Sequence, residues 1–528
     1  MTKRVITGHS LVTDLTTIVR AGLALPDAQY FCTETAARWL WPEWPAHDLE
    51  FCALKLTRMG AWRSTLGKLK PADFENLSKD ELSRRCGGDA EAPIWLYEVM
   101  APQILQEGLG RIFGLAMDVL PILAIIGGTG MTVDRTALKD TTKETELWLQ
   151  KTKTGLQRQL KIDNLNSHEQ VSRALFAPPW SATPLRETTK GHSVDRTSLL
   201  WARRESHSEA LTAVLDNLLE YSIQDKLFST YYRPWLEKTE TGKIHSFYGL
   251  GRTSTGRLGS WSVNLQNVPK RVRKLIVPSE GFDEILVCDY KMLELCVAAH
   301  VSNDLLMRKW ITEGQDLHAN TAAEVLGLPK PTTPQEIERF KLEHEDERAS
   351  GKMTNFAAIF GVGADSLTWK IFHDTRGKVY IDSTNMETYL EAFFTTFSGW
   401  KRYIDRLWTQ IKLGNIIRSP TGRRWCLEKS HAGWRKGMNY PVQSLASDLT
   451  IMAIRRIYRR LQELRMKSRM IGTVHDNAVF ETTKREKPRL ISLIHEVFEH
   501  PDTRAFGFEL SVPLLVDIKS GPNWAATS

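Results

Sequence analysis

The sequence has few cysteines, and they form no metal-binding or disulfide pattern. The six stand at 32, 52, 86, 288, 296 and 426, with no CxxC pair and no Cys/His spacing typical of a zinc site. This scatter excludes a small disulfide-stabilised scaffold and favours a reducing compartment. We therefore expect a cytoplasmic protein without structural zinc.

Other features are also missing. We see no run of about 18 apolar residues, no apolar secretion signal at the start, no internal repeat and no low-complexity segment. These absences predict a protein with no membrane partner. The hydrophobic content of 42% and the charged content of 25% are ordinary for a globular protein.

Length and charge set further limits. A chain of 528 residues is too long for one domain, so three or four units of about 100–200 residues are expected. The net charge of +8 favours a polyanionic partner, although many proteins with this charge bind no nucleic acid.

The order of patterns predicts an α+β multidomain protein. A mixed α/β region over about 1–110 is followed by helical patterns to about 236, and a Gly/Ser/Thr-rich strand-and-loop region covers 239–269. Helical patterns dominate 291–415, including a capping box at Thr333–Glu336, and the last hundred residues return to mixed α/β.

Two acids stand where packing alone favours Val or Ile. Asp289 ends the apolar run "ILVCDY", and Asp476 lies in the apolar stretch "MIGTVHDNAVFE". Each alone is compatible with a solvated cap at a strand end. Brought side by side, they repel unless cations lie between them, as in a two-metal site with Mg²⁺ ions about 3.5–4 Å apart.

A helix over 348–361, "RASGKMTNFAAIFG", is the second candidate. Arg348, Lys352, Phe356 and Phe360 recur every four residues, so they share one broad face. The basic pair suits phosphates and the rings suit a base and a sugar, while an amphipathic core helix with a solvated basic end is the alternative. His318, in "QDLHANTAAEVLG", is a weaker phosphate-binding candidate.

The order of these motifs resembles the family A DNA polymerases, the family of bacterial DNA polymerase I and its phage relatives. The segments "TSTGRLGSWSVNLQNVP", "VCDYKMLELCVAAHVS", "RASGKMTNFAAIFG" and "TVHDNAVFE" are similar to its TGRL/NLQNIP segment and its motifs A, B and C. "SPTGRRW" and "MNYPVQSLASDLTIMAI" resemble two further segments, and the resemblance spans about 110–528.

The resemblance implies a right-hand polymerase with palm, fingers and thumb, preceded by a reduced RNase H-like exonuclease remnant. The implied borders are 1–110 for a vestigial 3′–5′ exonuclease-like domain, 111–239 for connecting helices and thumb, 240–300 for the first part of the palm, 301–423 for the fingers and 424–528 for the second part of the palm.

It also implies residue roles in template-directed addition of dNTPs to a primer. Asp289, Asp476 and the Tyr290 backbone carbonyl would hold two Mg²⁺ ions, with Mn²⁺ able to substitute. Lys352 would be catalytic, and with Arg348 and His318 would bind the triphosphate. Glu294 would be the steric gate against a ribose 2′-hydroxyl, beside Phe356 and Phe360, and His475 would touch the primer end. The residues implied to line the primer–template minor groove are Arg257, Asn264, Gln266, Arg435, Asn439 and Gln443.

The sequence departs from the family at several positions. Motif C has Asn477 in place of Glu, so we expect polymerase activity to be retained but reduced. Motif B has Phe360 in place of Tyr, which removes a hydroxyl that supports the gate glutamate. Motif A has Lys291 and Met292 in place of Ser and Gln, and Cys296 in place of Arg. Together these changes suggest a divergent, phage-like or plasmid-like enzyme that would act in a host cytoplasm.

The N-terminal segment departs most. "VITGHSLVTDLTTIVRAG" resembles the second exonuclease motif, with Asp14 as its metal-binding acid, but the strand expected before it is missing. The third motif reads Tyr97-x3-Ala101, with its acid lost. We expect an enzyme without proofreading, unless a second chain supplies the missing segment.

Two other functions stay open. A single-subunit RNA polymerase shares the aspartates and the basic helix, although Glu294 argues against it. A catalytically impaired polymerase-like DNA-binding subunit is favoured by Asn477 and opposed by the retained Asp289 and Asp476.

Overall fold

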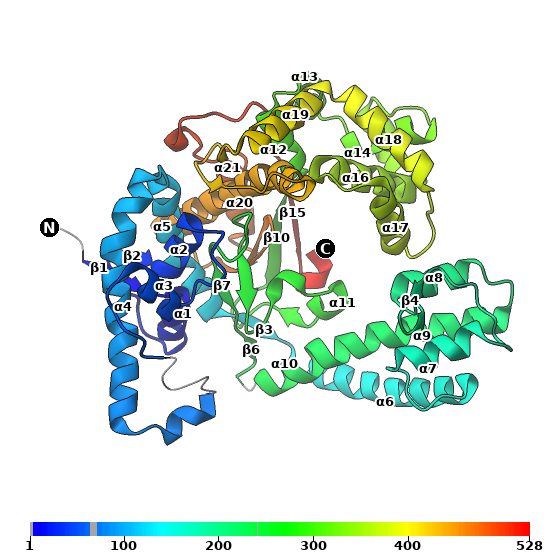
Figure 1. Cartoon of the computed structure of the whole chain (residues 1–528), viewed down its shortest axis with the longest axis horizontal. Helices are drawn as coiled ribbons and strands as arrows, with labels where there is room; N and C mark the ends of the chain where they lie inside the picture. Colours follow the sequence, from blue (N-terminus) through cyan, green and yellow to red (C-terminus); the bar gives the residue numbers. More distant parts are fainter. Residues whose placement is uncertain (1–3, 64–70, 240, 528) are drawn as a thin grey trace. The chain divides into compact units, whose positions relative to one another are not determined.

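A four-stranded antiparallel sheet lies at the centre of the part that positions the site (Figure 1). The computed structural model describes residues 4–63, 71–239 and 241–527. The sheet has the order β13-β14-β10-β15, with β13 at Arg469–Val474, β14 at Asn477–Thr482, β10 at Glu284–Tyr290 and β15 at Val516–Gly521. Residues 285–288 of β10 are all buried, because this strand has a neighbour on each side.

Helices from distant parts of the chain pack beside this sheet. α12 (Leu293–Ser302) follows β10 directly and contacts α20 (His431–Glu463), which in turn contacts α21 (Lys487–Phe498). Ser430 caps α20 by accepting a hydrogen bond from the Gly433 amide, at 3.2 Å. The apolar residues of α20, from Met438 to Leu461, are almost all buried, so this helix forms much of the core.

The N-terminal region is a small α/β arrangement. β1 (Val5–Gly8) pairs in parallel with β2 (Gln29–Cys32), and α1 (Val12–Arg20) packs against α5 (Gly110–Thr129). The remaining helices here are α2 (Thr33–Leu40), α3 (Leu49–Leu56) and α4 (Lys79–Gln106).

α5 corrects one expectation from the sequence. The prediction that no membrane-length apolar run exists is wrong, because this helix is long and apolar enough, with Asp118 as an isolated acid within it. The helix is 72% buried inside the protein over its apolar window, which is typical of a core helix. Its apolar length is therefore explained by packing on several sides.

Short strands pair near the sheet. β3 (Met131–Val133) pairs with β6 (Lys243–Ile244), and β9 (Ile276–Val277) completes that three-stranded sheet. β7 (Phe247–Gly249) pairs with β8 (Gly259–Trp261), and β11 (Ile417–Arg418) pairs with β12 (Arg424–Trp425). The loop from Arg252 to Leu258, which joins β7 to β8, carries the TGR motif.

The chain divides into two compact units. The first, called the sheet unit here, comprises 1–132, 243–303 and 402–528, and the second, called the helical unit, comprises 133–242 and 304–401. The first segment of the helical unit contains α6 (Arg135–Leu160), α7 (His168–Phe176), β4 (Glu187–Thr188), β5 (Gly191–His192), α8 (Arg196–Arg204), α9 (Glu209–Leu227) and α10 (Arg233–Lys238). The second contains α13 (Leu305–Thr312), α14 (Leu317–Leu326), α15 (Pro334–Glu343), α16 (Glu345–Phe360), α17 (Ala364–Asp374) and α18 (Ser383–Thr396), and α19 (Ser398–Leu413) runs out of it.

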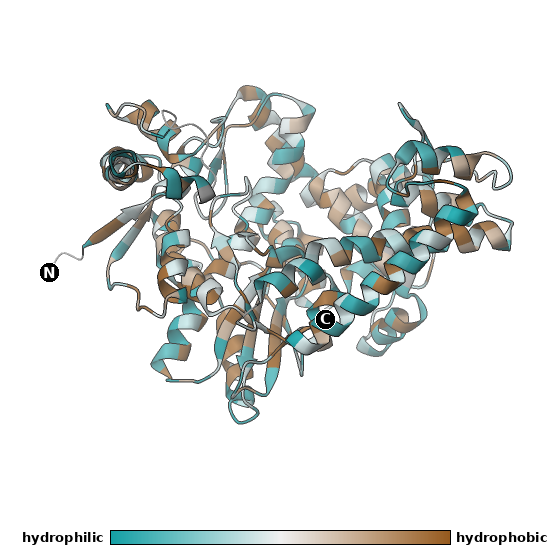
Figure 2. Cartoon of the chain, turned by 90° about the horizontal axis from the view of Figure 1, so that it is seen from below, coloured by the Kyte–Doolittle hydropathy of each residue, from teal (hydrophilic) through white to brown (hydrophobic). Residues whose placement is uncertain are grey.

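The two segments of the helical unit meet through aromatic side chains. The Trp201 ring, on α8, lies with its centroid 5.7 Å from Trp369 and 5.9 Å from Phe372, both on α17, and 5.4 Å from Tyr380. Figure 2 shows brown and teal residues side by side along the helices, as expected of helices that bury one face. The unit borders at 242/243 and 303/304 fall close to the predicted palm borders, whose exact positions stay predictions.

Candidate active site

The strand register brings the two predicted acids together. Asp289 of β10 is paired directly with Asn477 of β14, and Asp476 is the residue before Asn477, in the turn of the β13–β14 hairpin. On its other side Asp289 is paired with Asp517 of β15. Asp289 and Asp476 are therefore neighbours at one end of the sheet, although they stand 187 positions apart in the sequence.

The side chain of Asn477 shapes this turn. Its Oδ1 atom accepts a hydrogen bond from the Val474 amide at 3.1 Å, and its backbone carbonyl accepts one from the Thr473 hydroxyl at 2.7 Å. His475 has a positive φ of 54°, a conformation uncommon for residues other than glycine. The asparagine thus helps to close a strained two-residue turn that presents Asp476.

The environment of Asp476 suits a cation. Burial raises the pKa of its carboxyl group, against the lowering effects of Arg257 and His475. Its Oδ1 atom is buried and has no hydrogen-bond partner. A buried carboxylate oxygen without a partner is costly unless a positive group completes it, and Mg²⁺ is commonly held by one or two carboxylates together with substrate phosphates.

A larger ligand cluster is absent from the described part of the chain. Over residues 4–63, 71–239 and 241–527, no group of three or more His, Cys, Asp and Glu side chains could hold a metal ion. The donors that fit a divalent ion are thus the carboxylates of Asp289 and Asp476, with the carbonyl of Tyr290 at the end of β10 as the predicted third. This small set suits a metal that also binds substrate oxygens.

Arg257 and Glu294 form an ion pair at this end of the sheet. The Arg257 guanidinium donates through Nη2 to Glu294 Oε1. Glu294, in the first turn of α12, is 8% exposed. In this structure the arginine predicted to contact the minor groove therefore holds the predicted gate glutamate.

Gln266 bonds to the same hairpin turn. Its side-chain amide donates from Nε2 to the Thr473 carbonyl at 3.2 Å, and its Oε1 accepts from the His475 amide at 2.7 Å. Its neighbour Asn264 is exposed and caps the short turn that contains Gln266, accepting from the Gln266 amide at 3.1 Å. The Gln266 side chain thus positions the turn, and its minor-groove contact stays a prediction.

Three other predicted DNA contacts share one face of α20. Arg435, Asn439 and Gln443 are spaced by four residues, so they lie along one side of the helix. Arg435 is exposed, and the Oδ1 atom of Asn439 is buried without a hydrogen-bond partner. An amide oxygen of this kind can accept a hydrogen bond from a ligand.

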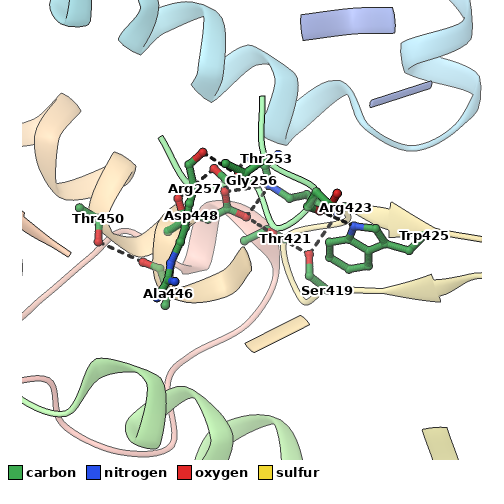
Figure 3. Close-up of polar contacts among 12 residues, drawn as sticks. Thr253, Gly256, Arg257, Ser419, Thr421, Arg423, Trp425, Ala446, Asp448 and Thr450 are labelled. Carbon is green, nitrogen blue, oxygen red and sulfur yellow. Dashed lines mark hydrogen bonds and ion pairs between the residues drawn. The ribbon is translucent and has the colours of Figure 1, made fainter. Parts of the chain in front are cut away.

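The sequence reasoning missed a buried ion pair that supports the site. Arg423 donates from Nη2 to Asp448 Oδ1 at 2.8 Å and from Nε at 2.9 Å, and the two side chains are 6% and 0% exposed (Figure 3). The Thr421 hydroxyl donates to Asp448 at 2.5 Å. Arg423 and Asp448 both lie in segments that resemble the family. The presence of an acid within the apolar part of α20 could have indicated a buried ion pair.

This ion pair lies against the loop that presents Arg257. The Ser447 hydroxyl, next to Asp448 in sequence, donates to the Gly256 carbonyl at 3.0 Å, and Thr253 donates to the Arg257 carbonyl at 2.8 Å (Figure 3). A Cβ atom at Gly256, whose φ is +77°, would lie 2.8 Å from the Arg423 guanidinium carbon. The glycine thus permits close packing of the loop on the ion pair.

In the helical unit, the predicted phosphate-binding side chains lie on two contacting helices, α14 and α16. Arg348 makes two hydrogen bonds with Asp316, from Nη2 at 2.8 Å and from Nε at 2.9 Å. His318 is 3% exposed, and its Nδ1 lies 3.0 Å from Asn355 Nδ2. Burial, with Arg348 and Lys352 nearby, lowers the pKa of His318 to about 3, so the imidazole is neutral at pH 7.

The aromatic part of α16 has the expected arrangement. The Phe356 and Phe360 rings are stacked, with centroids 6.1 Å apart and planes 21° apart, and Lys352 Nζ lies 6.0 Å from the Phe356 centroid. Lys352 is exposed. The four residues predicted to share a face of this helix thus present a basic part followed by two flat rings.

The two predicted exonuclease residues lie in the N-terminal region. Asp14 is exposed in the first turn of α1, and the Tyr97 ring packs edge-on against Phe31 with centroids 4.9 Å apart. Ala101 follows one turn later on α4. Among residues 4–63, 71–239 and 241–527, no group of three or more His, Cys, Asp and Glu side chains that could hold a metal ion surrounds Asp14.

Comparison with solved structures identifies the class of fold. The chain is similar to the POL domain of Pol1 from M. smegmatis in complex with DNA primer-template and dNTP, with a TM-score of 0.80 and 22% identity over 98% of this chain and 86% of that one. The predicted right-hand polymerase fold is therefore confirmed.

The family model for DNA polymerase family A matches residues 135–526, and the chain belongs to this family. It is 28% identical to the thermostable DNA polymerase I of Thermus thermophilus over 86% of this chain and 54% of that protein. It is 29% identical to DNA polymerase I of Geobacillus stearothermophilus over 82% of this chain and 48% of that protein. The chain thus spans about half the length of these relatives.

Proposed function

We propose that this protein is a DNA-directed DNA polymerase that adds dNTPs to a primer 3′ end by two-metal phosphoryl transfer. One observation carries the proposal. The register pairs Asp289 with the residue after Asp476, so two acidic residues are neighbours at one end of the sheet, and one oxygen of Asp476 is buried without a hydrogen-bond partner. Membership of DNA polymerase family A supports the reaction class.

Asp289, Asp476 and the Tyr290 carbonyl would hold the two Mg²⁺ ions, for which Mn²⁺ can substitute. Bound there, the ions would lower the pKa of the primer 3′-hydroxyl and neutralise charge on the phosphates. The protein's own contribution is to fix the two carboxylates, through the β10–β14 pairing and through Gln266, which binds the hairpin turn on both sides. His475, in the same turn, would touch the primer end.

The nucleotide would bind to α16. Arg348 can hold a phosphate only after exchanging its bond to Asp316, so we propose that this pair keeps the arginine oriented until a dNTP arrives. Lys352 would bind the triphosphate as the catalytic cation, with neutral His318 as a single hydrogen-bond donor. Phe356 and Phe360 would stack on the base and sugar, and Glu294, held by Arg257, would exclude a 2′-hydroxyl.

The primer–template duplex would lie along the predicted minor-groove residues, Arg257, Asn264, Gln266, Arg435, Asn439 and Gln443. We further propose that the palm, fingers and thumb follow the predicted borders and that the N-terminal region does not proofread. A second chain that completes this region, a phage-like origin and a cytoplasmic location belong to the same proposal.

Primer extension on a defined template, with dNTPs or NTPs and with or without Mg²⁺, tests the proposal. We expect Mg²⁺-dependent extension with dNTPs, and a loss of more than about a hundredfold in Asp289→Asn and in Asp476→Asn. Glu280→Gln, an exposed acid before β10, is the matched control and should keep full activity.

The same assay decides between the remaining functions. Equal, negligible extension by the wild type and by Asp476→Asn would favour a polymerase-like DNA-binding subunit, to which the change at Asn477 points. Faster extension with NTPs than with dNTPs would favour an RNA polymerase. Degradation of single-stranded DNA that disappears in Asp14→Ala would overturn the absence of proofreading.

A further inference from the structure

A groove lined by arginines lies in the sheet unit, between α5, the second half of α20 and the turn at 504–506. Its volume is about 490 Å³. Leu115, Met452 and Phe506 contribute apolar surface to it. Five arginines line it and define what we call the arginine groove: Arg111, Arg455, Arg456, Arg459 and Arg460.

The arginines outnumber the acids that bind them. Asp118 is shared between Arg455, at 2.7 Å, and Arg459, at 3.3 Å. Within the described part of the chain, Arg111 donates a hydrogen bond to the Ala505 carbonyl, at a long 3.4 Å. A guanidinium has five N–H donors, so one shared carboxylate leaves most of the donors of two arginines available.

A second pair of arginines is arranged in the same way. Glu496 binds Arg456 at 3.1 Å and lies 3.9 Å from Arg460, which also contacts Glu463 at 3.0 Å. The Nε atoms of Arg455 and Arg460 are buried and have no hydrogen-bond partner. These four arginines thus share three carboxylates, those of Asp118, Glu463 and Glu496.

The arginine groove continues into a second, apolar groove. The two share Gly110, Gly114, Asp118 and Arg459, and the second has a volume of about 760 Å³. It extends along α5 to α4 and β2, and its aromatic lining comes from Tyr30, Phe31, Tyr97 and Phe113. We call it the aromatic groove. Basic and aromatic surfaces thus adjoin along one side of α5.

We propose that the two grooves together bind an acidic segment of a partner protein that also carries apolar side chains. Carboxylates of such a segment would pair with the arginines in the two-bond geometry that guanidinium favours, and its apolar side chains would fill the aromatic groove. This site is separate from the proposed catalytic residues, and it assigns a binding role to Tyr97, which the polymerase reaction does not use.

The lining favours a peptide over DNA. Asp118, Glu463 and Asp502 lie among the arginines, and these acids repel a continuous phosphate backbone. A peptide can place its carboxylates between them. The aromatic groove, with a volume of about 760 Å³, also presents aromatic surface, to which a duplex backbone has no apolar group to offer.

Fluorescence anisotropy on the whole protein tests the proposal. The probe is a fluorescein-labelled peptide of about ten residues with alternating Asp and Phe, long enough to span both grooves at about 3.3 Å per residue. The comparison peptide has Asn in place of each Asp. We expect salt-sensitive binding of the acidic peptide, with at least about tenfold weaker binding of the Asn peptide.

Three variants locate the binding. Arg111→Glu/Arg459→Glu should weaken it at least about tenfold, and Asp118→Asn should strengthen it by removing a competing acid. Arg489→Glu, an exposed arginine on α21 outside the groove, should change nothing. Each variant should retain primer extension, because none alters a proposed catalytic residue, and a cooperative thermal transition checks that each variant is folded.

Three results would overturn the proposal: no binding of the acidic peptide, equal binding of the Asn peptide, or binding that the Arg111→Glu/Arg459→Glu variant leaves unchanged. Binding of a labelled DNA duplex of about twenty base pairs is measured in the same way. If that variant weakens duplex binding as much as peptide binding, the groove is a DNA surface and the peptide is not its ligand.

Discussion

At the scale of single residues, Asp476 combines a functional position with an unfavourable environment. Burial raises the pKa of its carboxyl group, so the ionised form is disfavoured in the folded protein. A carboxyl group whose folded-state pKa is raised contributes stability at low pH and loses it as the pH rises through that pKa. At pH 7 the charge therefore destabilises the protein unless a cation is bound.

Asp476→Asn should consequently raise the Tm in EDTA at pH 7, because the amide keeps the shape without the buried charge. In the wild type, Mg²⁺ or Mn²⁺ should raise the Tm, and in the variant this increase should be largely lost. Differential scanning calorimetry with and without metal measures both effects. A variant with a lower Tm in EDTA and an unchanged metal response would contradict the assignment of a metal to Asp476.

Residue identities were predictable where a charge stands among apolar neighbours. Asp289 and Asp476 were singled out for this reason, and the strand register brings them together. The use of Gln266 to hold the hairpin turn was not predictable, because its partners Thr473 and His475 are more than 200 residues away and nothing local indicates the pairing. The Arg257–Glu294 pair, 37 positions apart, was also not predictable, because nothing in the local sequence indicates that the two side chains meet.

At the scale of elements, the Arg423–Asp448 pair joins the β11–β12 hairpin to α20. Its side chains are 6% and 0% exposed, so either charge alone would be buried without compensation. Asp448→Asn should lower the free energy of unfolding by about 3–5 kcal/mol. Replacing both partners, with Arg423→Met and Asp448→Leu, should recover much of that loss.

Urea denaturation measures this difference, and an exposed pair provides the control. Arg203 and Asp216 form an ion pair on α8 and α9 with both side chains more than 40% exposed. Asp216→Asn should cost less than about 1 kcal/mol. Similar losses at Asp448 and Asp216 would show that burial does not decide the strength of the pair.

Elements with strong local signals were predictable. The capping box at Thr333 and Glu336 opens α15 as expected, and the stretch around Asp476 forms the expected strand hairpin. The apolar length of α5 was not recognised from the sequence. Its burial on several sides could be seen only with its packing partners in place.

At the scale of the whole molecule, two histidines with lowered pKa values make stability depend on pH in both units. Burial lowers the pKa of His9, in the sheet unit, to about 4, and that of His318, in the helical unit, to about 3. The unfolded chain binds these protons near pH 6.5, so stability is full above that pH and is lost as the pH falls below it.

We expect the wild type to lose stability between pH 7 and pH 5, by about 1–2 kcal/mol for each histidine. His318→Gln should remove the loss of stability that arises in the helical unit. His9→Gln should remove the loss that arises in the sheet unit. Urea denaturation at the two pH values measures this. The expectation fails if His318→Gln is as acid-sensitive as the wild type.

The distribution of exposed and buried thiols determines where a fluorescent dye can be attached to this protein in solution. Cys32, Cys52, Cys288 and Cys296 are buried, so a reagent cannot reach their thiols. Burial also raises the pKa of Cys52 and of Cys296 to about 12, so these two thiols do not form the reactive thiolate at pH 7. Only the thiols of Cys86 and Cys426 are exposed among the six. A maleimide dye at pH 7 should therefore attach to two positions in the folded protein and to six in urea, as mass spectrometry would count. The wild-type chain already carries the two handles that a fluorescence study of its motions requires.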